Sequence, residues 1–319
     1  MGKYTAWLKE IRAQEFQEFG GKGANLGELV NTGFNVPVAF CIKGGSYFYF
    51  LQSNNLTEAI TEIARGIDFN DINDLTEKTM AIQSLITQAQ IPKDLEDEIC
   101  EQYRIMQTLE TRPFVAVRSS VAIKETSVSS FPGMMDTFHY VLGEEQVLEH
   151  VKRCWASVWS ARAATIRHHK GISHSLAIIA PVVQQMIDAD VAGIIFTINP
   201  MTSSKHEMII QSSWGIGESV VSGMCANDYF ILDKATLSIK KNEIGNKTEA
   251  ITYDWEKGCG TRQVTVRPEK ASAPSLTEPM LRELGAVGTR IETHFGIPQD
   301  IEWAYEKGKL FILQTRKAK

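Results

Sequence analysis

The strongest constraint on the fold of this chain is a change in hydrophobic periodicity near residue 171. Before it, apolar residues recur at helical spacings of three and four, most regularly over residues 147–166. After it, short runs rich in β-branched residues alternate with turn residues, a pattern typical of strands. The order of a mixed first half and a strand-rich second half predicts an α+β chain with two lobes, residues 1–188 and 189–319.

The same patterns predict individual elements. Helices are expected over residues 20–30, 56–64 and 147–166, with a strand at 113–117. A last helix is opened by Thr277, has Pro279 in its first turn and is closed by Gly296. Further strands are expected at residues 176–187, 191–198, 207–212, 229–232, 237–241, 250–253, 263–266, 300–305 and 310–316.

Composition excludes several classes of protein. With 43% hydrophobic and 22% charged residues, the 319-residue chain is neither disordered nor fibrous. Its net charge of -5 includes no basic excess for a nucleic-acid backbone, so no nucleic-acid partner is expected. The most apolar run, residues 176–183, is far shorter than the roughly 20 residues that cross a bilayer, so we expect no membrane association and a cytoplasmic location. Five scattered cysteines without CxxC spacing predict reduced, mostly buried thiols.

A glycine-rich segment, residues 19–27, places four glycines around Lys22 ahead of an apolar helix. Such a segment lets backbone amides approach an anion, and the helix N-terminus and the lysine add positive potential. It is not a Walker A loop, because the GxxxxGK[ST] spacing is absent. The alternative is a plain glycine-rich turn.

A second candidate follows the expected strand at 113–117. The strand leads into Arg118-Ser119-Ser120, and the chain then runs to a segment of small and hydroxyl residues at 129–137. An arginine with small hydroxyl residues and a glycine suits a phosphate-covering loop, because the guanidinium can engage two phosphate oxygens at once. A surface loop with a solvated arginine is the alternative.

The last two expected strands carry the sharpest local pattern, since strand alternation places Asp300 and Glu302 on one face. A three-residue loop at 307–309 would set Glu302 opposite Gln314 and Asp300 opposite Arg316, whereas a two-residue loop would shift the register and separate these pairs. The first arrangement suits Mg²⁺, which takes oxygens from one or two carboxylates or amides, with Arg316 beside a transferred group. The alternative is a surface ion pair between Asp300 and Arg316.

Taken together, these segments resemble the N-terminal ATP-binding domain of the pyruvate phosphate dikinase and phosphoenolpyruvate synthase family, which includes rifampicin phosphotransferase and phenylphosphate synthase. The likeness runs almost from end to end and keeps the family's order. It is carried by Gly20-Gly21-Lys22-Gly23, Val36-Pro37, Val117-Arg118-Ser119-Ser120, Phe131-Pro132-Gly133-Met134-Met135-Asp136-Thr137, Val183-Gln184-Gln185-Met186, Ala192-Gly193-Ile194-Ile195-Phe196-Thr197, Asn199-Pro200, Gly215-Ile216-Gly217-Glu218 and Asp300-Ile301-Glu302-Trp303.

The resemblance implies an ATP-grasp fold with the nucleotide between two lobes. It also implies an ATP- and Mg²⁺-dependent phosphotransferase that passes the β-phosphoryl group of ATP to a histidine on a separate swivelling domain, giving AMP and phosphate. By motif position it implies phosphate contacts for Lys22 and Arg118, a phosphate-covering loop with Gly133, Asp136 and Thr137, an adenine cleft with Gln184, Mg²⁺ ligands Glu302 and Gln314, and a phosphoryl-directed, catalytic Arg316.

The resemblance also shows what this segment lacks. None of the seven histidines lies in a stretch like the family's Thr-rich phosphohistidine motif, so a histidine-carrying partner domain or subunit is expected. His168-His169 is expected to be a solvated helix end. Two segments depart from the family pattern, Ala226-Asn227-Asp228 and Thr315-Arg316-Lys317.

Because no residues follow Lys319, the sequence favours the ATP-binding subunit of a split enzyme such as phenylphosphate synthase, whose small-molecule acceptor is phenol. The alternatives are the first domain of a rifampicin phosphotransferase or phosphoenolpyruvate synthase, and a nucleotide-binding module without catalysis.

Overall fold

The structure is a computed structural model that describes residues 1–109, 112–122, 136–174, 178–221, 223 and 225–318. The chain divides into two compact units: unit 1 contains residues 1–31 and 38–186, and unit 2 contains residues 32–37 and 187–319. The change between the units at residue 186 lies close to the expected lobe boundary. Unit 2 thus includes the short segment 32–37 in addition to the C-terminal part of the chain.

Unit 1 is built on a five-stranded antiparallel sheet. Its strand order is β1 (Thr5–Trp7), β2 (Ala39–Ile42), β7 (Val182–Gln185), β3 (Val115–Arg118) and β5 (Thr137–Val141). Two short strands, β4 (Val121–Ala122) and β6 (Ile178–Ile179), form a separate pair. Its helices are α1 (Phe16–Asn31), α2 (Gly44–Ser53), α3 (Leu56–Arg65), α4 (Ile72–Gln88), α5 (Lys93–Leu109), α6 (Glu144–Ser157) and α7 (Ala161–His169).

The two faces of this sheet have different roles. One face supplies the main core, where Phe40, Val117 and Val183 belong to the same apolar cluster as Ile86 of α4 and Trp155 of α6. The opposite face carries Cys41 and Val182, against which α1 packs through Gly23. A Cβ atom at Gly23 would lie 3.0 Å from the Cys41 sulfur, so a glycine lets the helix approach the sheet closely.

Unit 2 is built on a six-stranded antiparallel sheet. Its strand order is β11 (Ile239–Glu243), β10 (Asp228–Asp233), β9 (Glu207–Trp214), β8 (Val191–Phe196), β14 (Gln299–Glu306) and β15 (Lys309–Lys317). The remaining elements are a hairpin of β12 (Glu249–Tyr253) and β13 (Thr261–Thr265), and the helices α8 (Glu218–Val221), α9 (Pro268–Ala271) and α10 (Glu278–Phe295).

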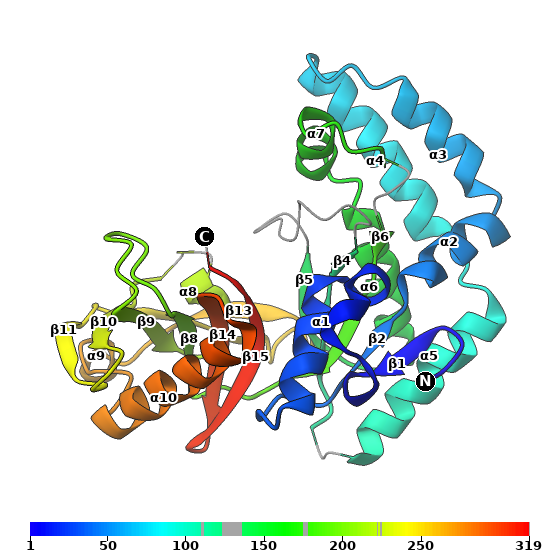
Figure 1. The fold of residues 1–319 in the computed structure, drawn as a ribbon. Coiled ribbons are helices and arrows are strands. Elements are labelled where there is room, and N and C mark those ends of the chain that lie inside the picture. Colours follow the sequence, from blue (N-terminus) through cyan, green and yellow to red (C-terminus); the bar gives the residue numbers. More distant parts are fainter. Residues whose placement is uncertain (110–111, 123–135, 175–177, 222, 224, 319) are drawn as a thin grey trace. The chain divides into compact units, whose positions relative to one another are not determined.

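The helix α10 covers one face of the six-stranded sheet (Figure 1). Gly288 of α10 lies against Met208 and Ile195, which point to this face. Strand alternation therefore places Asp300 and Glu302 on the opposite face, since Ile301 between them pairs with Ile195 and points toward α10. The polar pairs that the sequence singled out lie on the face opposite α10, where Asp300 and Gln314 are buried.

Most of the elements that the sequence predicted are present and two of them are divided, whereas α2, α4, α5, β1, β2 and β5 had no predicted range. The α+β class is confirmed, as are α3, α10 with its cap at Gly296, and the β14–β15 pair. The helix expected over 147–166 is two helices, because the Ser160 side chain accepts from the Ala163 amide and starts α7 anew. The strand expected over 176–187 is likewise divided: residues 175–177 lie outside the described ranges, and Pro181, which lacks an N–H donor, separates β6 from β7.

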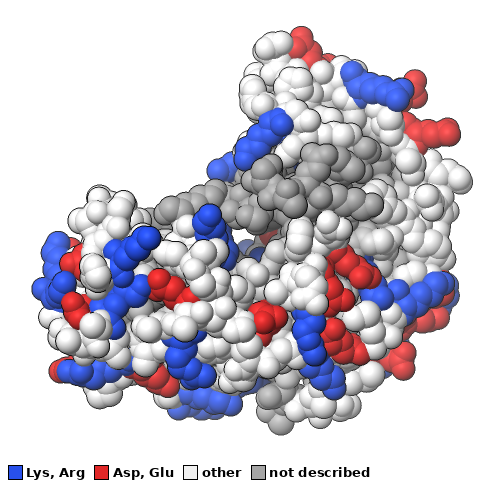
Figure 2. Space-filling model, viewed as in Figure 1, with Lys and Arg blue, Asp and Glu red and all other residues white. Residues whose placement is uncertain are grey.

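The thiols agree with the expectation of reduced, mostly buried cysteines. Positive and negative side chains are interspersed on the face drawn in Figure 2. All five cysteines lie within the described ranges and are free, with four buried and Cys259 exposed. None of the helices in these ranges combines the length and the apolar character that crossing a bilayer requires.

Candidate functional site

The sheet of unit 1 joins Arg118 to Gln184 on the face that α1 covers. Arg118 pairs with Val182 in the ladder and Gln184 with Ala116, so both side chains point to the same side. Arg118 Nη1 donates a hydrogen bond of 2.7 Å to Gln184 Oε1. The residues are only 7% and 3% exposed, so this contact fixes a buried cation at the end of β3.

The amide nitrogen of Gln184 provides a test of whether the site suits a nucleotide. Gln184 Nε2 is buried and has no hydrogen-bond partner among the described residues. Because a buried donor without an acceptor is costly, its orientation suits a ligand with an acceptor atom, such as a ring nitrogen of a base. The buried guanidinium next to it suits the phosphates of the same ligand. The residues present therefore fit a nucleoside phosphate.

Lys22 lies near the start of the regular part of α1, where Ser120 accepts from the backbone amides. Gly20 has a φ of 68° and interrupts α1, so the regular helix starts after it. The backbone amides of Lys22 and Gly23 donate to Ser120 Oγ at 3.1 and 3.2 Å. The expectation that the amides of the glycine cluster contact an anion is thus corrected for these two: Ser120 satisfies them, and the lysine side chain is the remaining cationic group.

The segment before β5 brings Asp136 and Thr137 to the same region. Thr137 pairs with Arg118 in the ladder, and the Asp136 carbonyl accepts from the Ser119 amide at 3.2 Å. Asp136 is exposed as a whole residue. Partial desolvation of its carboxyl group nevertheless raises the pKa of that group. Gly133, the other predicted member of this loop, lies outside the described residues.

The charges of Lys22 and Asp136 both affect the pKa of the buried Cys154 thiol. Its pKa is raised to about 12, mainly by burial; the Lys22 ammonium opposes this rise and the Asp136 carboxylate adds to it. Unit 1 brings together five of the predicted site residues: Lys22, Arg118, Asp136, Thr137 and Gln184.

In unit 2 the hairpin of β14 and β15 forms the predicted pairs by an unexpected route. The loop has two residues, Lys307 and Gly308, and both have positive φ, as in a type I′ turn. Of the two loop lengths that the sequence left open, the structure therefore has the two-residue loop. A register shift at Glu302/Trp303 leaves Leu313 as an extra residue in β15. This β-bulge restores the pairs Glu302 with Gln314 and Asp300 with Arg316, which the short loop alone would separate.

Two polar contacts result from this register. Gln314 Nε2 donates to Glu302 Oε1 at 3.1 Å. Arg316 places Nε at 2.8 Å and Nη2 at 2.7 Å from the same oxygen of Asp300. Burial raises the pKa of Asp300, the Arg316 guanidinium opposes this, and the neighbouring Glu302 adds to the rise. Asp300 is 7% exposed, so it is a buried anchor for the more exposed arginine.

The donor set of this hairpin fits Mg²⁺. One carboxylate and one side-chain amide lie opposite each other, and Mg²⁺ in nucleotide sites needs only one or two such oxygens beside water and phosphates. The Gln314 amide would turn its oxygen toward the ion in place of the N–H that now faces Glu302. No group of three or more His, Cys, Asp or Glu residues that could hold a metal occurs within the described ranges, so an all-protein metal cage is not what these residues offer.

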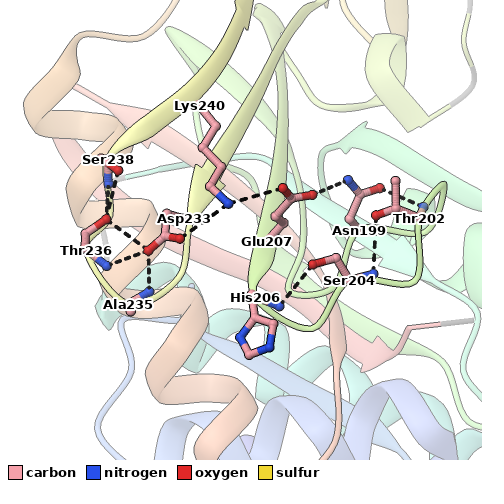
Figure 3. A network of polar contacts seen from close by, with 10 residues as sticks. All are labelled: Asn199, Thr202, Ser204, His206, Glu207, Asp233, Ala235, Thr236, Ser238 and Lys240. Atoms are coloured by element: carbon pink, nitrogen blue, oxygen red, sulfur yellow. Dashed lines mark hydrogen bonds and ion pairs between the residues drawn. The ribbon is translucent and has the colours of Figure 1, made fainter.

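Other motif residues have structural roles that the sequence did not reveal. Asn199 accepts from the Met201 amide. It also accepts from the Thr202 amide and donates to Glu207, which binds Lys240 (Figure 3). This network fixes the turn after β8. The segment 226–228, which departs from the family pattern, leads into β10, and Asp228 at the start of that strand is fully buried. His168 and His169 end α7 and are exposed, as expected.

Ser120 is a residue of the site whose role sequence reasoning missed. The sequence analysis noted Ser120 only as a small hydroxyl residue after Arg118. Its hydrogen-bond partners lie 97 to 101 positions away in sequence, so only the fold reveals them. Asp300 was recognised as a face-sharing carboxylate, and the structure makes it the partner that holds Arg316.

The sequence has clear relatives. Over residues 16–319 it matches the family described as the pyruvate phosphate dikinase AMP/ATP-binding domain. A probable phosphoenolpyruvate synthase of Methanocaldococcus jannaschii is 38% identical over 316 residues, which cover 98% of this chain and 26% of that protein. The phosphoenolpyruvate synthase of Pyrococcus furiosus is 35% identical over 354 residues, covering 98% of this chain and 43% of its own length.

A probable phosphoenolpyruvate synthase of Methanothermobacter thermautotrophicus is 36% identical over 318 residues, covering 99% of this chain and 46% of that protein. The chain thus spans between 26% and 46% of the length of these relatives. Since the family match covers nearly all of the sequence and agrees with these relatives, the chain belongs to the pyruvate phosphate dikinase AMP/ATP-binding domain family.

Proposed function

We propose that this chain is the ATP-binding part of a dikinase-type phosphotransferase of the phosphoenolpyruvate synthase kind. Residues of both units bind one Mg-ATP in an ATP-grasp arrangement. The β-phosphoryl group passes to a histidine on a separate domain or subunit, with release of AMP and phosphate, and then to a small acceptor. A cytoplasmic location belongs to this proposal, because the reaction draws on the cytoplasmic ATP pool.

The observation that carries the proposal is the buried contact between Arg118 and Gln184. It fixes a guanidinium in one orientation and leaves the Gln184 Nε2 donor for a base. Arg118 then holds phosphate oxygens through its planar fork, and Lys22 adds a point charge. Asp136 and Thr137 lie beside Arg118, where a phosphate-covering loop would begin.

The hairpin of unit 2 supplies the reacting end. Glu302 and Gln314 would hold Mg²⁺, which when bound neutralises charge on the phosphates. Arg316 is steadied by Asp300, which faces Nε and Nη2 and leaves the rest of the guanidinium for the transferred group. In such transfers positioning and charge neutralisation provide most of the rate enhancement.

The relatives support the proposed partner and acceptor. Each of the three relatives is at least twice as long as the matched part, which supports a histidine-carrying region outside these 319 residues. Their names favour phosphoenolpyruvate formation over the phosphorylation of phenol that the sequence analysis put first.

The test is transfer of label from [β-³²P]ATP. The purified chain is mixed with Mg²⁺ and the histidine-carrying domain of a phosphoenolpyruvate synthase, and acid-labile label on that domain is measured together with AMP. We expect both products from the unaltered chain, and ATP binding without transfer from Arg316→Ala. Binding of ATP with no label on any carrier would instead support a nucleotide-binding module without catalysis.

A further inference from the structure

The Ser120 hydroxyl joins the two elements of unit 1 that carry Lys22 and Arg118. Its oxygen accepts from the backbone amides of Lys22 and Gly23, at 3.1 and 3.2 Å, and donates to the Phe19 carbonyl at 2.8 Å. Ser120 is 1% exposed, so water does not replace these bonds when the hydroxyl is lost. One side chain therefore satisfies both N–H groups at the start of the regular part of α1.

The backbone at Gly20 is shaped for this contact. A Cβ atom at Gly20 would lie 2.2 Å from Ser120 Oγ and 2.7 Å from the Ser120 carbonyl carbon, and its φ of 68° also disfavours other residues. Gly20 thus lets the chain pass directly over Ser120 and turn into the helix. The conformational freedom of this glycine serves the docking of α1 on Ser120.

The backbone carbonyl of Ser120 also has a hydrogen-bond partner. It accepts from the Ala180 amide at 2.8 Å, which ties the turn after β3 to the chain leading into β7. Arg118, two residues earlier, bonds to Gln184 on that same strand. The turn that carries Ser120 is therefore fixed relative to Arg118, and α1 takes its position from the turn.

We propose that Ser120 is a positioning residue that holds Lys22 at a fixed place beside Arg118 and so sets the affinity of the site for the triphosphate part of the nucleotide. The inference rests on the proposed function, in which these two cations bind phosphates. Without the hydroxyl, two buried amides lose their acceptor, and the start of α1 shifts to find another. Lys22 moves with it, whereas Gln184 keeps its place on the sheet.

The experiment measures the dissociation constants of ATP and adenosine for the 319-residue chain by calorimetry. The variants are Ser120→Ala, Lys22→Met and the double variant, with Ser46→Ala as the matched control. Ser46 is also buried in unit 1, at 2% exposure, and its hydroxyl donates to the Tyr4 carbonyl away from the site. Should Ser120→Ala not fold, Ser120→Cys replaces it, because sulfur keeps the shape of the side chain and is a weaker acceptor.

We expect Ser120→Ala to weaken ATP binding by about tenfold and to leave adenosine binding unchanged, while in the Lys22→Met background it changes ATP affinity by less than about twofold. Ser46→Ala should change neither affinity. An equal loss of ATP affinity with and without Lys22, or a parallel loss for adenosine, would overturn the inference and leave Ser120 a purely structural role. If Lys22→Met alone leaves ATP affinity unchanged, the phosphate role of Lys22 in the proposed function is wrong, and the inference is overturned with it.

Discussion

Glu302 and Gln314 face one another across β14 and β15 because Leu313 adds one residue to β15. Between the turn and Trp303 the ladder has the register of a two-residue loop, and beyond the bulge it is displaced by one position. Leu313 itself packs against a small apolar cluster that includes Ala192, Ala304 and Phe311, beside the polar pair. The bulge is therefore part of how the predicted metal ligands meet.

Removal of the Glu302 carboxylate tests the metal assignment. Because the amide of Glu302→Gln is a weaker ligand for Mg²⁺ than a carboxylate, we expect the gain in ATP affinity on adding Mg²⁺ to fall by about tenfold or more. Calorimetric titrations with and without Mg²⁺ measure this gain. Glu243→Gln, a surface carboxylate of β11, is the control. An unchanged response to Mg²⁺ in Glu302→Gln would remove Glu302 from the metal site.

The buried carboxyl of Asp300 should make stability depend on pH. Its pKa is raised above 3.8, mainly by burial, so the folded chain holds this proton more tightly than the unfolded chain. The stabilisation from this proton is present at low pH and is lost as pH rises through the folded pKa. In urea unfolding at about pH 4 and about pH 7, the stability of the unaltered chain relative to Asp300→Asn should therefore decrease with rising pH. If the stability of the unaltered chain relative to Asp300→Asn stays constant or grows with rising pH, the pKa of Asp300 is not raised in the folded chain.

Sequence patterns identified the elements of this fold better than their breaks. The apolar stripe over 147–166 continues through both α6 and α7, but a serine cap at Ser160 divides it, and such a cap competes locally with a continuous helix. The strand break at Pro181 follows from a missing N–H and was readable in principle. The bulge at Leu313 was not, because it depends on how the whole ladder pairs.

The site residues likewise fall into those that the sequence named and those whose roles only the fold shows. Strand alternation was enough to place Glu302, a motif after an expected strand pointed to Arg118, and Gln184 was named only by the family resemblance. The glycine cluster was assigned to an anion, yet part of its freedom serves close packing, since Gly20 and Gly23 bring α1 against Ser120 and Cys41. Contacts across a hundred positions of sequence leave no local signal.

A fully buried ion pair in unit 2 provides a stability prediction. Lys247 and Asp228 are both 0% exposed, and Asp228 also accepts from the backbone amide and the hydroxyl of Ser275. Lys247→Met leaves a buried carboxylate without its cation and should lower the free energy of unfolding by about 3–5 kcal/mol.

Adding Asp228→Asn should recover part of that loss, because it removes the uncompensated charge. Urea titration measures both variants, with Lys241→Met of an exposed pair as the control. If Lys247→Met unfolds at the same urea concentration as the unaltered chain, the pair does not stabilise unit 2.

His174 should make unit 1 sensitive to mild acid. It stacks on Phe69 and Trp159 and accepts from Arg167 Nε at 3.2 Å. Burial, with the nearby Arg167 and His168, lowers its pKa to about 4, so the folded chain resists a proton that the unfolded chain accepts. Stability should therefore fall as pH drops from 6.5 toward 4, and His174→Asn should show a smaller fall. The exposed His206→Asn is the control, and an equal fall in all three chains would contradict this account.

The proposed function requires that a single Mg-ATP engages residues of both units. Hydrogen–deuterium exchange of the 319-residue chain, with and without Mg-ATP, tests it most directly. We expect the nucleotide to slow exchange both around Lys22 and Arg118 in unit 1 and along β14 and β15 in unit 2, with the second effect lost in Glu302→Gln. Slower exchange confined to one unit would contradict the claim.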